Sequence, residues 1–248
     1  MAQAVLAQAG LGSLRPVAAN AALARRRSLN CFSQPAAGRA LRRLGPLPLM
    51  PGTNCQKAIQ IWSEKNEGAN PEEAEVVKLL CLSPPIEKMD SSLNQLVNVR
   101  HLALSTNCID KMISLPALKN IQILSLGRNV IKKIAGLEEI GATLQELWLS
   151  YNSISTLDGL QPCSKLHTLF MSNNKIKDWS EIEKLQANPE LASVLFLGNP
   201  MYEGLSKKQA RIKVKEALQE VKTVDGEMIT GDDMDDDEGD GEESPKAA

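Results

Sequence analysis

The chain has 248 residues, in which 28 lysine and arginine residues stand against 30 aspartate and glutamate residues, giving a formal net charge of −2 at pH 7. Without the seven arginines of residues 1–52, the remainder has a net charge of −9, which argues against general nucleic-acid binding. No stretch approaches the roughly 18 apolar residues of a membrane span, so we expect no membrane partner.

Residues 1–52 are predicted to be a basic extension, either disordered or transit-like. They contain no acid, and the first acidic residue of the chain is Glu64. Arginine-rich, acid-free composition is typical of organelle transit peptides. A disordered arm or a gene-model extension has a similar composition, so these interpretations stay open.

Residues 53–82 are predicted to form a helical cap at the front of a folded domain. The segment contains QKAIQIWSEKNEG and then PEEAEVVKLLCL. Pro71 followed by Glu72 and Glu73 is a good helix start, because proline suits the first helical position and acids suit the first turn. We expect the apolar residues that follow to pack on the rest of the domain.

Five copies of the phrase LxxLxLxxN follow, reading VRHLALSTN, IQILSLGRN, LQELWLSYN, LHTLFMSNN and LASVLFLGN. They end at asparagines spaced by 22, 23, 22 and 25 residues: Asn107, Asn129, Asn152, Asn174 and Asn199. Repeats of this length and pattern are leucine-rich repeats. The alternating leucines face one side of a short strand, and stacked units bury them in one core. We therefore predict an α/β solenoid of 22-residue repeats with a parallel concave sheet and helical caps at both ends.

The five asparagines are predicted to form a structural ladder, since an amide can donate to and accept from the backbone of neighbouring turns. After each asparagine, apolar residues recur at about every third position, as in Ile109, Met112 and Leu115. This rhythm predicts a turn and short helical pieces on the convex side.

Residues 205–221 are predicted to form an amphipathic cap helix, with four apolar side chains inward: Leu205, Ile212, Leu218 and Val221. The phrase VKTVDG offers a last short strand and a turn at Asp225-Gly226. Residues 53–229 thus form the predicted repeat domain. Residues 230–248 are predicted to be a disordered acidic tail, because nine acids in residues 232–243 cannot support a core.

No residues have the spacing of an active site. His101 and His167 are far apart in the repeat scheme, and we interpret both as surface or edge residues. No serine or cysteine has a base at a recognisable spacing, and no cluster has metal-ligand spacing. We expect no catalytic residue, metal, cofactor or small-molecule substrate, and hence a protein that is not an enzyme.

Residues that alternate with the leucines should point outward on the concave sheet. The central outward column starts small and ends large and apolar: Ala103, Ser125, Trp148, Phe170 and Leu195. Adjacent strands lie about 4.8 Å apart, so the bulky members should form a contiguous patch of the kind that marks interaction sites. We predict partner binding through five residues: Trp148, Phe170, Leu195, Leu197 and Ile123. The alternative is that the cap or tail shields the tryptophan.

Five basic residues lie on the predicted terminal helix: Lys207, Lys208, Arg211, Lys213 and Lys215. They are either a solvated helix face or a docking strip for an acidic surface such as a tubulin tail.

Several phrases resemble a known family. SPPIEKMDSSLN, LSTNCIDK, LSLGRNVIK, LQELWLSYN, MSNNKIKDW and FLGNPMYE are similar to segments of the leucine-rich-repeat light chains of axonemal outer-arm dynein, over about residues 55–229. The resemblance implies a light chain that binds the motor region of a dynein heavy chain, contacts microtubules and regulates motility in the axoneme of a cilium or flagellum. It implies attachment through Trp148, Phe170 and Leu195, with the terminal helix as a second contact.

Two departures from the family pattern stand out. Gln219 occupies a position where the family often has proline, and family members usually begin close to the front cap, so residues 1–52 are additional. If that extension is a transit peptide, the chain goes to an organelle. The alternative functions are a phosphatase-regulating repeat protein or another interaction scaffold, and an acidic-tailed nuclear protein of the histone-chaperone type.

Overall fold

Eight strands in the described part form one sheet, in the order in which they occur in the sequence. The structure is a computed structural model that describes residues 52–229. The strands are β1 (Val76–Lys78), β2 (His101–Ala103), β3 (Ile123–Ser125), β4 (Glu146–Trp148), β5 (Thr168–Phe170), β6 (Ser193–Leu195), β7 (Thr223–Val224) and β8 (Glu227–Met228). The first seven are parallel, and β8 is antiparallel to β7.

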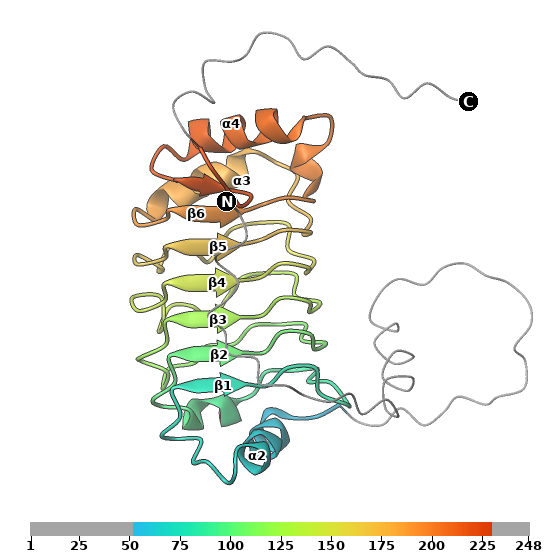
Figure 1. The fold of residues 1–248 in the computed structure, drawn as a ribbon, viewed down its shortest axis with the longest axis vertical. Helices are drawn as coiled ribbons and strands as arrows, with labels where there is room; N and C mark the ends of the chain where they lie inside the picture. The colour runs from blue at the N-terminus through green and yellow to red at the C-terminus, as the bar shows by residue number, and fades with distance from the viewer. Residues whose placement is uncertain (1–51, 230–248) are drawn as a thin grey trace, which may run out of the picture. The chain divides into compact units, whose positions relative to one another are not determined.

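Figure 1 shows the strands stacked one above another, with α2 (Cys55–Lys65) beyond β1 and α4 (Lys207–Ala217) at the other end. The predicted leucine-rich-repeat solenoid with a parallel sheet and two helical caps is confirmed. The tail predicted at 230–248, and all but the last residue of the extension predicted at 1–52, lie outside the described residues.

The core is one continuous layer behind the sheet. The middle residues of the central strands are buried and pair with one another in register: Leu102, Leu124, Leu147, Leu169 and Val194. The buried cluster extends from Cys55 in α2 to Val224 in β7. Each side chain of this size contributes about 1.5–3 kcal/mol when it leaves water, so stacking of the repeats is the main source of stability.

The five asparagines of the repeat phrase are buried and join neighbouring coils through their side chains. The Asn152 Nδ2 donates to the carbonyls of Leu149, in its own coil, and Leu126, in the preceding coil, each at 3.0 Å. Its Oδ1 accepts from the Ile131 N–H at 3.0 Å. The Leu126 carbonyl also accepts from Asn129, so each such carbonyl links two successive asparagines and the ladder is continuous.

The residue before each ladder asparagine has a left-handed backbone conformation. The φ angles are 58° at Thr106, 56° at Arg128, 59° at Tyr151 and 53° at Asn173, and Gly198 has 79°. This conformation costs a residue other than glycine about 1–2 kcal/mol. The hydrogen bonds of the following asparagine offset that cost and fix the turn out of each strand.

The front of the sheet differs from the prediction. Residues 71–73 form a turn, not the start of a helix, and Val76–Lys78 is strand β1, in register with β2. The phrase VVKLLCL is therefore a degenerate repeat, in which Leu82 stands where later coils have asparagine. Cys81 has the left-handed φ of 51° found before each ladder asparagine. Pairing with the exposed edge of β2 outweighs the local helix signal.

The front cap is a single helix. Asn54 begins α2 by accepting a hydrogen bond from the Lys57 N–H at 2.8 Å, and the helix buries Cys55, Ala58 and Ile59 against the end of the core. The Cys55 N–H donates to the carboxylate of Asp90, which is the N-cap residue of η2 (Ser91–Gln95). This hydrogen bond ties the front cap to the first convex segment.

The convex side has fewer helical pieces than predicted. The coils that follow Asn107, Asn129 and Asn152 contain turns without helices. Neighbouring coils approach closely on this side, and a Cβ at Gly136 would lie 2.4 Å from the Ile113 carbonyl carbon. The fourth interval, from Asn174 to Asn199, is 25 residues long and contains α3 (Ser180–Glu183) and η3 (Lys184–Ala187).

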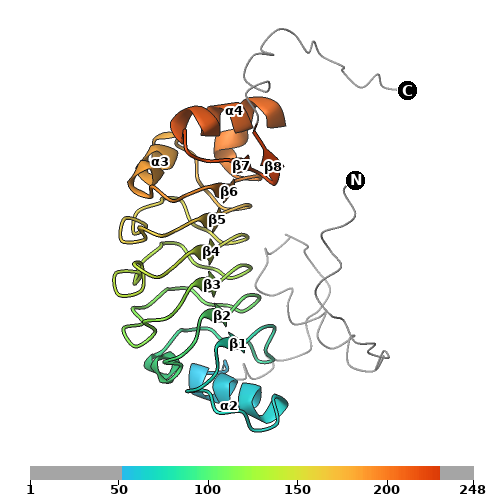
Figure 2. The same cartoon turned by 60° about the vertical axis from the view of Figure 1, so that its left-hand side comes forward.

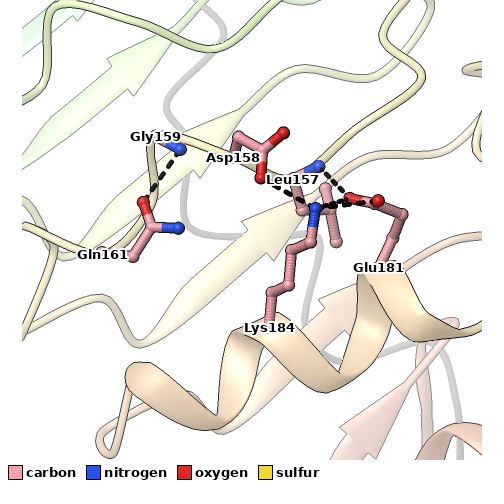
Figure 3. A network of polar contacts seen from close by, with 6 residues as sticks. All are labelled: Leu157, Asp158, Gly159, Gln161, Glu181 and Lys184. Atoms are coloured by element: carbon pink, nitrogen blue, oxygen red, sulfur yellow. Dashed lines mark hydrogen bonds and ion pairs between the residues drawn. The ribbon is translucent and has the colours of Figure 1, made fainter.

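The short helix α3 is held to the preceding coil by the polar network in Figure 3. The Glu181 carboxylate accepts from the Leu157 N–H at 2.8 Å. The Lys184 Nζ contacts Asp158 at 2.7 Å and Glu181 at 2.8 Å. Hydrogen bonding to Lys184 lowers the pKa of Asp158, and the same contact raises the pKa of Lys184. The network positions α3 against α4, which lies beside it (Figure 2).

The back cap begins with η4 (Pro200–Tyr202) and continues into α4, which is shorter than the predicted helix. Ser206 and Gln209 form a capping box at its start, and Leu218 ends it. The buried positions of α4 are Ala210 and Val214, whereas the predicted inward residue Ile212 is half-buried. The predicted Leu205 is also half-buried, and the other two predicted residues, Leu218 and Val221, are buried after the helix.

The sheet ends in a hairpin at Asp225-Gly226, where both residues have positive φ. The Asp225 Oδ1 accepts from the N–H groups of Phe196 and Leu197 at 2.7 and 2.9 Å. Its Oδ2 accepts from the Tyr202 hydroxyl at 2.8 Å. One carboxylate thus joins the residues just after β6, η4 and the hairpin. Within residues 52–229, no helix is long and apolar enough to cross a membrane.

We expect Asn152→Ala to lower the free energy of unfolding by about 1–3 kcal/mol. The change leaves the Ile131 N–H without its acceptor and removes one donor from each of two buried carbonyls. Urea unfolding followed by circular dichroism measures the effect. Asn120→Ala, at an exposed asparagine outside the ladder, is the control and should change little. Equal unfolding curves for the two variants would contradict the structural role of the ladder.

Candidate functional site

The outward face of the sheet carries the predicted partner-binding residues on neighbouring strands. Ser125, Trp148, Phe170 and Leu195 are register partners on β3 to β6. Trp148, Phe170 and Leu195 are half-buried, and so is Ile123 on β3. Leu197, just after β6, is 42% exposed. None of the five belongs to the leucine core behind the sheet. We call these five residues the concave patch.

Trp148 lies within a row of stacked rings. Its ring centroid is 5.9 Å from that of Phe170, with an interplanar angle of 27°, and 6.0 Å from that of His101, with an angle of 66°. Its Nε1 donates to the Glu146 carboxylate at 3.1 Å. Offset and edge-on aromatic pairs of this kind contribute about 0.5–1.5 kcal/mol beyond their buried area, so the row has a preferred arrangement on the open face.

The contact between Trp148 and His101 explains why two small residues on the open face of the sheet are buried. His101 is on β2 and Trp148 on β4, two strands and therefore about 9.6 Å apart. The rings can meet only if their side chains lean toward each other over β3, the strand between them. Accordingly Ala103 and Ser125, which point to the same face, are only 4% and 2% exposed.

His101 is half-buried against the tryptophan, and its pKa is lowered. Burial is the largest cause, the charge of Lys78 on β1 also lowers the pKa, and the charge of Glu146 on β4 raises it. His101, which the sequence analysis interprets as a surface or edge residue, thus lies half-buried on the outward face of β2. His167 is exposed, with its Nδ1 3.1 Å from the Thr168 hydroxyl. The repeat pattern distinguishes the two histidines, since His101 is the first residue of β2 and His167 precedes β5. It does not give the contact of His101 with Trp148, because that contact depends on side-chain direction.

The basic residues of α4 are partly used within the cap. Arg211 forms an ion pair with Glu227 on β8. The Lys213 Nζ lies 4.5 Å above the ring of Trp179, which stacks on Tyr202. The Lys215 Nζ donates to carbonyls after the helix, those of Gln219 and Val221. Lys207 and Lys213 are exposed, and Lys208, Arg211 and Lys215 are half-buried. The strip retains its positive charge, but three of its members also hold the helix in place.

Chemically reactive groups are not gathered in the described part of the chain. No group of three or more histidine, cysteine, aspartate or glutamate residues within it could hold a metal ion. Cys55 and Cys163 are buried free thiols, and burial raises the pKa of each to about 12. At neutral pH such thiols are almost wholly protonated and are poor nucleophiles.

Comparisons with known proteins give relatives over most of the described chain. A family described as "Leucine Rich repeats (2 copies)" matches residues 142–184. The chain is 46% identical to "Dynein axonemal light chain 1" of Homo sapiens over 186 residues, which cover 74% of this chain and 97% of the relative. It is 44% identical to the protein of the same name from Chlamydomonas reinhardtii, over 73% of this chain and 92% of the relative.

Among solved structures, one chain of the "Drosophila melanogaster SNF/U2A' complex" matches with a TM-score of 0.45 and 23% identity. The match covers 51% of this chain and 72% of that one.

We expect iodoacetamide at about pH 8 to alkylate Cys81 rapidly in the folded chain and to leave Cys55 and Cys163 unmodified. Cys81 is exposed, whereas the other two are buried with a pKa of about 12. Peptide mass spectrometry before and after unfolding in urea measures the modification, and the unfolded chain should react at all three sites. Fast alkylation of Cys163 in the folded chain would contradict its position in the core.

Proposed function

The chain belongs to the family of axonemal dynein light chain 1, and we propose that it is a non-enzymatic light chain that binds the motor region of a dynein heavy chain and microtubules, and so regulates ciliary or flagellar motility. The identity of 44–46% to relatives with this name, over nearly their whole length, supports the light-chain role. The same names support the axoneme of a cilium or flagellum as its location. An organelle remains the alternative if residues 1–52 act as a transit peptide.

The concave patch is the proposed contact with the heavy chain. The observation that supports it most strongly is the stack of Trp148 on Phe170 at 5.9 Å, on the open face and outside the leucine core. Leu195 and Leu197 extend the patch along β6. Partly exposed tryptophans in apolar patches are frequent energetic hot spots of protein interfaces. Fixed register between short strands also presents the patch as a rigid surface, which reduces the entropy lost on binding.

The basic strip of α4 is the proposed contact with microtubules. Lys207 and Lys213 are exposed, and the contacts of Arg211, Lys213 and Lys215 within the cap hold the helix in one orientation. Positive side chains on a helix that is held in one orientation suit an acidic partner such as the tubulin surface. The concave patch and the strip lie on different parts of the solenoid, the central sheet and its terminal cap, so one chain can contact both partners.

We expect Trp148→Ala and Phe170→Ala each to weaken binding to a recombinant dynein heavy-chain motor region about 30-fold, the size of a hot-spot truncation. Thermal unfolding should change little, because both side chains are half-buried and outside the core. Surface plasmon resonance measures the affinity. Tyr151→Ala, at an exposed aromatic residue after β4, is the control. Loss of the folded state in either test variant would show that these side chains are structural.

The same capture experiment separates the rival functions. Binding of a phosphatase catalytic subunit or of histones, with no binding of the heavy-chain motor region, would contradict the light-chain proposal.

We expect added salt to weaken binding of the chain to microtubules, because charge pairs at an exposed surface are screened. The double variant Lys207→Ala, Lys208→Ala should bind more weakly at low salt, by up to about fivefold for each lysine, and should show a smaller salt dependence. Lys132→Ala, Lys133→Ala, at exposed lysines on the loop after β3, is the matched control. Co-sedimentation with microtubules measures binding, and equal effects of the two double variants would argue against the α4 strip.

A further inference from the structure

Two polar atoms on the concave face are buried without a hydrogen-bond partner among residues 52–229: the Ser125 Oγ and the His101 Nε2. Ser125 is 2% exposed although it points to the open face of the sheet. Buried polar groups in folded proteins are nearly always paired. Two unpaired atoms beneath the same face therefore indicate that the arrangement is incomplete and that a further group is needed to satisfy them.

Trp148 is the register neighbour of Ser125 on the open face, and its ring meets that of His101 on β2. The two rings therefore meet over β3, the strand between them, where Ala103 and Ser125 are almost fully buried. The hydrogen bond of Trp148 to the sheet is that from Nε1 to Glu146 at 3.1 Å. The indole is half-buried on the open face, and no backbone hydrogen bond of the sheet depends on its position. The ring can therefore move away from Ala103 and Ser125 without any change in the backbone.

We propose that Trp148 is a flap over a polar subsite formed by Ser125 Oγ and His101 Nε2, and that the docking segment of the partner displaces the ring and places a carboxylate side chain there. This inference rests on the proposed function, because the partner concerned is the one that docks on the concave patch. When the indole moves away from Ala103 and Ser125, it remains beside Phe170 and adds its apolar surface to the contact with the partner.

The chemistry of the subsite favours a carboxylate. The serine hydroxyl and a protonated imidazole nitrogen both donate hydrogen bonds, and a carboxylate accepts both. The charged groups that face His101 are Lys78 on β1 and Glu146 on β4, and the effect of Lys78 is the larger. The stronger charge acting on His101 is thus a positive one, which also favours a carboxylate beside it.

A bound carboxylate would couple docking to protonation of His101. In the free chain, burial and Lys78 hold the pKa of His101 below its ordinary value, so the imidazole is mostly neutral at pH 7. A carboxylate beside the ring would raise that pKa in the complex. The complex then binds more protons than the free chain does, and its affinity rises as the pH falls through the histidine range.

The test is isothermal titration calorimetry of the full chain with the recombinant heavy-chain motor region, at about pH 6, 7 and 8. We expect the wild-type affinity to rise severalfold, up to about tenfold, from the highest to the lowest pH. Ser125→Ala should weaken binding about threefold to tenfold at each pH, the effect of one lost hydrogen bond. Its thermal unfolding should be unchanged, because the hydroxyl has no partner within the described chain.

His101→Phe is the second variant. It retains an aromatic ring beside Trp148 and should bind with an affinity that no longer depends on pH. Ser193→Ala, at a half-buried serine on the same face of β6, is the control and should behave as the wild type at every pH.

The outcomes separate this inference from the function on which it rests. If the wild type binds the motor region and both Ser125→Ala and His101→Phe bind equally well with the same pH dependence, the subsite is overturned and the proposed function stands. If Ser125→Ala weakens binding but the wild-type affinity does not change with pH, a neutral group occupies the subsite. The proposal that a carboxylate binds there is then overturned. If the wild type does not bind the motor region, both proposals fail.

Discussion

The hydrogen bonds of five buried asparagine side chains determine the geometry on which the rest of this structure depends. Strands of two or three residues form too few backbone hydrogen bonds to fix their own spacing. The asparagine ladder compensates. Each amide donates to a carbonyl of its own coil and to one of the preceding coil, and it accepts an N–H of that preceding coil. The left-handed residue before each asparagine is retained for the same reason, even where it is Thr106 or Tyr151 and the conformation is costly.

Because the strands are in fixed register, one set of residues stabilises the fold and another set forms the binding surface. The inward positions are leucine or valine and form one core, whereas the outward positions are free to vary because they do not pack behind the sheet. Trp148 and Phe170 become neighbours because they occupy the same position in successive strands. A binding surface can therefore be changed one repeat at a time, without disturbing the coil that carries it.

The sequence predicted what depends on periodicity and missed what depends on side-chain direction. The spacing of the asparagines and the alternation of the leucines located β2 to β6 and the central outward column. Strand β1 was missed, because Leu82 replaces the asparagine that marks the other coils. The position of the indole over Ser125 was also missed, since a repeat pattern says which face a residue is on but not where a long side chain leans.

In the caps, too, the sequence predicted the elements but not the contacts between their side chains. Composition identified α4 and its charges, but the ion pair of Arg211 with Glu227 and the position of Lys213 over Trp179 depend on tertiary packing that no local pattern encodes. The contacts of Glu181 and Lys184 also depend on tertiary packing, although the longer fourth asparagine interval was a signal that this coil differs from the others.

Asp225 determines how such a scaffold can lengthen. Its carboxylate accepts the N–H of Phe196, just after β6, whose equivalents in earlier coils donate to the next coil, and the antiparallel strand β8 reverses the chain at that border. A new coil appended after β8 would find no parallel partner. A coil duplicated between β2 and β6 would find identical neighbours on both sides. Tandem duplication within the array, not addition at its finished end, is therefore the route by which this architecture can grow.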